Sequence, residues 1–182
     1  MWGGGSVAAA KRAGRYGLGF LAHTNLAGMQ EAYEAACREA GHEPGFALLP
    51  PRETPSVIFV AEDVDAAWHE LGAHLLHDAC AYARWNPGNE TSAGISHIET
   101  VDELRATSHS HKIFGVDETV EHVRNGGMLT LSPLCGGVPP DIAWPYLERV
   151  VNVVMPAVAA SHGDVSVNHH FEALDHMFPS AT

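Results

Sequence analysis

The sequence predicts an α/β protein whose strands run parallel. Short apolar segments typical of buried strands alternate along the chain with helical segments. The chain has 182 residues, of which 46% are hydrophobic, so it can bury a core of ordinary size. It contains no internal repeat and no linker that would divide it. We therefore expect residues 1–160 to form one domain, and residues 161–182, which lose all periodicity, to form a loosely held tail.

Three segments are predicted as strands because they are short, apolar and bounded by turn residues. They are Gly17–Leu21, Ser56–Val60 and Met128–Leu131. The second is the clearest, since a proline-rich loop comes directly before it. We expect a parallel sheet of about four strands.

The helices are predicted from apolar spacing of three and four residues and from their capping residues. Ser6 begins a helix through Tyr16, and Asn25 is expected to cap a second that stops at Gly41. Further helices are expected from Asp63 through Leu76, after Thr100, from Asp117 to Gly126, and from Asp141 to Pro156.

Charge and cysteine content exclude some classes of function. The chain carries 10 basic and 22 acidic residues, for a formal net charge of −12, which would repel nucleic-acid phosphates. Three widely spaced cysteines are typical of reduced thiols. No run of residues has the length of a transmembrane helix, and no signal peptide is evident. We expect a cytoplasmic protein that binds neither nucleic acid nor membrane.

Four motifs occur together in one order. They are Gly3-Gly4-Gly5-Ser6 with Lys11–Phe20, Phe59–Asp63 with Ala66-Ala67-Trp68, Leu75–Ala79 with Tyr82-Ala83 and Trp85, and Leu131–Pro140 with Ala143-Trp144. Together they resemble the C-terminal half of the bacterial-luciferase-like, flavin-dependent oxidoreductases, over about residues 2 to 158.

That resemblance implies a partial (β/α)₈ barrel, a TIM barrel reduced to its C-terminal half. It also implies an oxidoreductase, in particular a monooxygenase, that uses reduced FMN or the deazaflavin F420 on a small organic substrate. The family's N-terminal strands have no counterpart in this sequence. We therefore expect the chain to form a homo-oligomer or to bind a partner that supplies the missing half-barrel. A non-catalytic barrel fragment is the alternative.

Two glycine-rich turns are candidates for cofactor binding. Gly4, Gly5 and Ser6 precede a helix, where backbone N–H groups can approach an anion closely. The turn of Cys135, Gly136 and Gly137 follows a predicted strand, as phosphate-binding loops of barrels do. Either turn could instead serve only to reverse the chain. Gly3, Gly5 and Ala8 also match the dinucleotide-binding fingerprint, which would need a complete βαβ unit.

Histidines supply the remaining candidates. His77, near the end of a helix, is the candidate catalytic acid–base beside the substrate, and its alternative is a partly exposed helix residue. His109 and His111 resemble the paired histidines of metal-dependent barrel hydrolases, although no apolar strand is evident around them. We assign no metal ligands.

Overall fold

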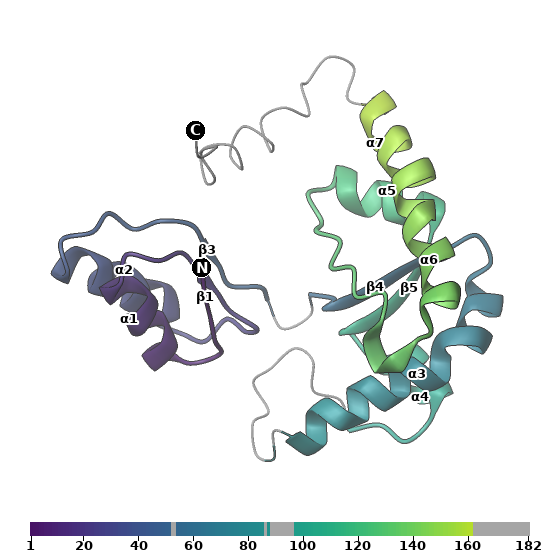
Figure 1. The fold of residues 1–182 in the computed structure, drawn as a ribbon, viewed down its shortest axis with the longest axis horizontal. Helices are drawn as coiled ribbons and strands as arrows, with labels where there is room; N and C mark the ends of the chain where they lie inside the picture. Colours follow the sequence, from purple (N-terminus) through teal and green to yellow (C-terminus); the bar gives the residue numbers. More distant parts are fainter. Residues whose placement is uncertain (52–53, 86, 88–96, 162–182) are drawn as a thin grey trace.

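The computed structural model describes residues 1–51, 54–85, 87 and 97–161. It is an α/β structure with parallel strands, as the sequence predicts. The described strands form two small sheets, of three and two strands, instead of one sheet of about four. Figure 1 shows the two sheets in two groups of elements, which we call the first unit (residues 1–51) and the second unit (the described residues from 54 onward).

The first unit contains a parallel sheet in chain order. Its strands β1 (Trp2–Gly3), β2 (Phe20–Leu21) and β3 (Ala47–Leu48) each contribute two residues. Helix α1 (Val7–Arg15) connects β1 to β2, and helix α2 (Met29–Glu39) connects β2 to β3. This sequential order is the one that a (β/α)₈ barrel uses.

A small core between these helices and the sheet holds the first unit together. Phe20 and Met29 are completely buried, and the ring of Phe20 stacks on that of Tyr33 at a centroid distance of 6.0 Å. The Tyr33 hydroxyl donates to the Leu18 carbonyl and accepts from the Gly45 N–H, both at 3.1 Å. These two bonds fix the loops that lead into β2 and β3.

The second sheet does not follow chain order. Strand β4 (Val57–Ala61) pairs with β5 (His111–Gly115) in parallel, and Ile58 forms a parallel bridge with Leu131. The Val57 N–H donates to the Ser110 carbonyl, whereas the Ile58 N–H donates to the Thr130 carbonyl. Successive N–H groups of a strand point to opposite sides. Leu131 therefore lies on the edge of β4 away from β5, so that β4 is central.

Helices cover both faces of this sheet. Val57, Phe59 and Ala61 face a core built with α3 (Val64–Trp85) and α4 (Val101–Thr107). Ile58 and Val60 face a second core, which includes Val120 of α5 (Val116–Arg124). This doubly wound arrangement differs from a barrel, whose helices all lie outside.

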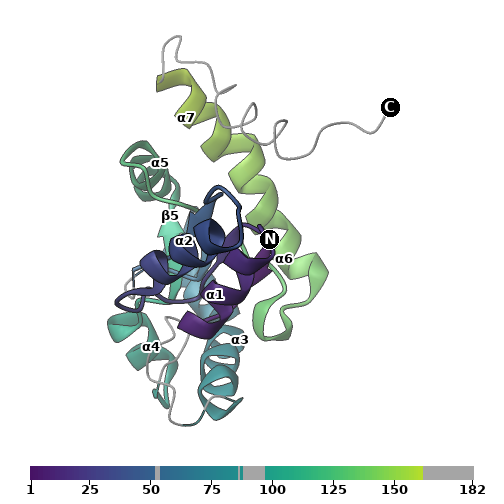
Figure 2. The same ribbon diagram turned by 90° about the vertical axis from the view of Figure 1, so that its left-hand side faces the viewer.

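The last helix is longer than expected. Helix α6 (Pro140–Arg149) continues through a π-helical turn, η2 (Val150–Val154), into α7 (Met155–Ser161). Figures 1 and 2 show these segments as one long helix along the second unit. Pro156 was expected to end the helix. It instead lies inside the continuous helix, just after the π-helical turn η2.

Several sequence predictions differ from the structure in detail. Asn25 does not cap α2, whose N-cap is Gly28 in a left-handed conformation. The predicted strand Met128–Leu131 is reduced to the bridge at Leu131. Strand β5 was missed, because its sequence HKIFG is half polar. The tail 161–182 lies outside the described residues, apart from its first position. No helix in the described part of the chain is long and apolar enough to cross a membrane.

Candidate functional site

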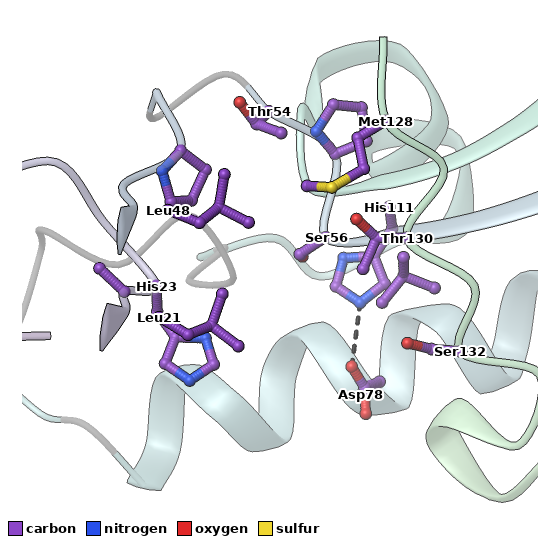
Figure 3. Close-up of a pocket in the computed structure, with 14 residues that line it drawn as sticks. Leu21, His23, Leu48, Thr54, Ser56, Asp78, His111, Met128, Thr130 and Ser132 are labelled. Atoms are coloured by element: carbon purple, nitrogen blue, oxygen red, sulfur yellow. Dashed lines mark hydrogen bonds and ion pairs between the residues drawn. The ribbon is translucent and has the colours of Figure 1, made fainter. Parts of the chain in front are cut away.

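A cavity with a volume of about 360 Å³ lies between the two sheets. Although a hollow at the carboxyl end of β4 is larger, at about 540 Å³, we call this one the main cavity because both sheets line it. The first unit contributes the carboxyl ends of β2 and β3, and the second contributes the amino ends of β4 and β5 (Figure 3). Its apolar lining residues are Leu21, Ala22, Leu48, Pro50, Pro55, Val57 and Met128, and its polar ones are His23, Thr54, Ser56, Asp78, His111, Thr130 and Ser132. This volume and mixed lining are typical of sites for small molecules.

His111 and Asp78 form the central polar pair of the cavity. His111 is the first residue of β5 and is 1% exposed, and its Nε2 lies 3.0 Å from Asp78 Oδ2 on α3. Figure 3 shows this contact at the cavity wall. Burial lowers the pKa of His111, and the neighbouring Asp78 only partly offsets that effect. The imidazole is therefore neutral near neutral pH.

A ring of hydrogen bonds determines which nitrogen of His111 carries the proton. An ionised carboxylate only accepts, so Nε2–H donates to Asp78. The bare Nδ1 then accepts from the Ser110 hydroxyl at 2.8 Å. The Ser108 hydroxyl lies 3.1 Å from that of Ser110 and accepts from the His111 N–H at 3.2 Å, so it donates to Ser110. Every donor in the network has one acceptor.

Asp78 keeps unused hydrogen-bonding capacity. Its side chain is 37% exposed, and its contact with His111 uses only Oδ2. Among the described residues, Oδ1 has no hydrogen-bond partner, and no lysine or arginine lines the cavity. Together with burial of the thiol, the Asp78 charge raises the pKa of Cys135 to about 12. A negative charge at the cavity wall is thus only partly compensated.

The first predicted cofactor turn lies at the same edge of its sheet as the cavity. Gly4, Gly5 and Ser6 follow β1, and the Gly4 N–H donates to the Leu21 carbonyl. Ser6 caps α1 by accepting from the Ala9 N–H. These residues do not line the main cavity. A Cβ on Gly5 would make only an ordinary contact, at 3.8 Å from the Thr24 methyl group, whereas a Cβ on Gly4 would lie 2.6 Å from the Ala9 Cβ. The turn therefore has room beside Gly5, while Gly4 packs against α1.

The second predicted cofactor turn packs on a helix. Cys135, Gly136 and Gly137 form a 3₁₀ turn against α3, and the Gly136 carbonyl oxygen lies 3.0 Å from Nδ1 of His74. A Cβ on Gly136 would lie 1.9 Å from the His74 carbonyl oxygen. Helix–turn contact explains this glycine. The turn does not line the main cavity and is not brought together there with Gly4–Ser6.

The predicted histidines lie in different surroundings. His77 is exposed on α3 and does not line the cavity, whereas its neighbour Asp78 does. His109 is exposed before β5, while His111 is buried and engaged on both nitrogens. In the described residues, no group of three or more His, Cys, Asp or Glu side chains is arranged to hold a metal ion.

A signal for Asp78 was present in the sequence. It lies seven residues after Leu71 and three after Leu75, both of which are completely buried, so all three share one face of α3. An acidic residue on the buried face of a helix indicates a polar partner. Its partner, 33 positions away, could not be found from periodicity.

A second hollow lies at the carboxyl end of β4. Its charged lining residues are Glu62, Asp63, Glu70, Asp141 and Arg149. Arg149 donates to the Val60 carbonyl at 3.1 Å, and the Tyr146 hydroxyl donates to Glu70 at 2.5 Å. The polar groups of this hollow therefore bond mainly to one another.

The chain was also compared with known proteins. No protein-family model matches it, and no curated protein matches it.

Proposed function

We propose that this chain is the C-terminal part of a luciferase-like, flavin-dependent oxidoreductase, in particular a monooxygenase, and that the main cavity receives its organic substrate. The observation that carries the proposal is the position of this cavity at the carboxyl ends of β2 and β3 in the first sheet, which is the sheet in barrel order; the second sheet contributes the amino ends of β4 and β5. Parallel α/β enzymes bind ligands at that edge. The four motifs in family order support the same function.

The partial (β/α)₈ barrel is proposed for the first unit. Its strands follow chain order and are connected by helices, as barrel strands are. The second unit departs from barrel order, because Leu131 returns to the far edge of β4. A partner or a second copy that pairs with a free edge of the first sheet would extend it toward a barrel.

The two cofactor turns differ in their fit to reduced FMN or F420. The Gly4–Ser6 turn fits a phosphate beside Gly5, because that residue has open space and the turn stands at the N-terminus of a nine-residue helix, whereas Gly4 packs against Ala9. In the Cys135–Gly137 turn, α3 fills the space beside Gly136, and only Gly137 has open space beside it. When bound, the flavin supplies hydride transfer or activation of O₂. The chain's own residues would orient the substrate and exclude water from it.

Titration of FMN with the chain, followed by flavin fluorescence, tests this proposal. The ring would be covered by only part of a barrel, so we expect weak binding, with a dissociation constant above the micromolar range. Gly5→Asp should weaken binding further, because the added carboxylate would repel the phosphate while its Cβ fits. Ala27→Asp adds the same charge at an exposed position and is the matched control. Undetectable binding, or equal effects of both variants, would contradict the proposal.

A further inference from the structure

We infer that the main cavity binds a small organic amine, with its protonated nitrogen on Asp78 and its apolar part between the two sheets. Binding of the amine does not depend on flavin. Only the further step, that this amine is the substrate, rests on the proposed function.

The charge of the cavity points to a cation. Asp78 is the one carboxylate among the described lining residues, and its contact in the cavity wall is a neutral imidazole. The Asp78 side chain is 37% exposed, so water solvates it while the cavity is empty. A ligand that displaces this water must offer a cationic group or further hydrogen-bond donors in its place. A ligand ammonium group would supply both, and its hydrogen bond to a charged oxygen is among the stronger kinds.

The hydrogen-bond ring makes Asp78 a fixed acceptor. His111 donates through Nε2–H and is itself held by Ser110 and by the backbone of β5. The imidazole therefore keeps Oδ2 in place and leaves Oδ1 for the ligand. His111 acts here as a positioning residue, because it acts through Asp78.

The remaining walls indicate the shape of the ligand. Leu21 and Leu48 lie opposite the Asp78–His111 pair in Figure 3, and Met128 and Val57 add apolar surface. Ser132 and Thr130 lie near the pair and can accept further N–H donors of an ammonium group. An anionic ligand would meet the Asp78 charge with no lysine or arginine among the described lining residues to offset it, and only the imidazoles of His23 and His111 as nitrogen groups.

Three probes that share a phenyl ring and differ in charge separate the effect of ligand charge from the effect of ligand shape. Phenethylamine is a cation, phenethyl alcohol is neutral and phenylacetate is an anion. We would titrate each into the unmodified chain near pH 8, following the His111 imidazole signals by NMR. We expect millimolar binding of phenethylamine, as suits so small a ligand. Its affinity should exceed that of the alcohol by about tenfold, and phenylacetate should bind more weakly still.

Two variants test whether the higher affinity for the amine than for the alcohol depends on Asp78. Asp78→Asn keeps an acceptor for His111 but removes the charge, so it should lose about tenfold in amine affinity and equalise amine and alcohol. His77→Asn changes the exposed neighbour on the same helix and should alter neither affinity. Equal binding of amine and phenylacetate, no binding of the amine, or an unchanged amine affinity in Asp78→Asn would each overturn the inference. Because no flavin is present, such a failure leaves the FMN titration as a separate test of the proposed function.

Discussion

Substitution of Gly136 by alanine tests whether the Cys135–Gly137 turn is a packing element or an open cofactor turn. Gly136 has φ of 59°, and a Cβ there would lie 1.9 Å from the carbonyl oxygen of His74. Gly137 has a similar φ of 78°, but nothing lies within 4 Å of its Cβ position. The two glycines therefore share the backbone conformation and differ in the space beside them.

The expected cost follows from these two terms. Placing alanine in a left-handed conformation costs about 1–2 kcal/mol, which applies to both Gly136→Ala and Gly137→Ala. The clash with α3 adds roughly 1–3 kcal/mol for Gly136→Ala alone, as overpacking of a tight contact does. With an m-value of about 2 kcal/mol per molar, in the middle of the range for small proteins in urea, the two midpoints should differ by roughly 0.5–1.5 M.

Urea unfolding followed by circular dichroism measures this difference, with Gly137→Ala as the matched control. Gly136→Ala should unfold at the lower urea concentration, or fail to fold while Gly137→Ala folds. Equal midpoints would refute the packing argument. The Cys135–Gly137 turn would then have open space at Gly136, and it would return as a candidate for flavin binding.

Four further outcomes are expected. Tyr33→Phe should lower the free energy of unfolding by about 1–3 kcal/mol in urea titration, because it removes two part-buried hydrogen bonds that contribute about 0.5–1.5 kcal/mol each. The pKa of His111 is lowered in the folded state, so below the ordinary value near 6.5 the unfolded chain binds more protons than the folded chain. The free energy of unfolding should therefore decrease as the pH is lowered below about 6.5, and His111→Asn should make it depend less on pH. Cys135, whose pKa is raised to about 12, should resist iodoacetamide in the folded chain, as mass spectrometry of digests would reveal. Exposed apolar side chains along the last helix should make the chain associate in sedimentation at about 150 mM salt; Val151→Lys, at a position 52% exposed, should favour the monomer, and Asn152→Lys should not.

Local signals in the sequence were sufficient for much of the secondary structure. The apolar run of β4 and the Asp63 side chain that accepts from the Ala66 N–H were both predicted. Thr100 caps α4 by accepting from the Glu103 N–H, as the capping pattern indicates. These features depend on residues within a few positions of one another, so periodicity and capping rules reach them.

Pairing between distant segments was beyond those rules. Strand β5 begins with His111 and Lys112, which resemble a surface segment until β4 is placed beside them. Leu131 bonds to the edge of β4 opposite β5, and no property of its own segment selects that edge. The order of the second sheet, and hence its doubly wound form, follows only from these long-range contacts.

The candidate drawn from the sequence, His77, lies one residue from the side chain that lines the cavity. His77 drew attention because imidazole titrates near neutral pH, but the side chain that enters the cavity is that of Asp78. Adjacent helix positions point about 100° apart, so the chemistry of a residue and its direction must be judged together. The buried face of α3, marked by Leu71 and Leu75, selects Asp78 over His77.

The tautomer of His111 connects the fold to what the cavity can bind. If Nδ1 carried the proton, Nε2 would face the Asp78 carboxylate as a second acceptor, and the pair would repel. The Asp78 carboxylate excludes this arrangement, and the Ser110 hydroxyl, which can rotate to donate, completes the network at Nδ1. The position of this hydroxyl just before β5 depends in turn on Ser110 accepting the Ser56 and Val57 N–H bonds beside β4. Pairing of β4 with β5 thus holds Asp78 as an acceptor at the cavity wall, where a cationic ligand finds its partner already in place.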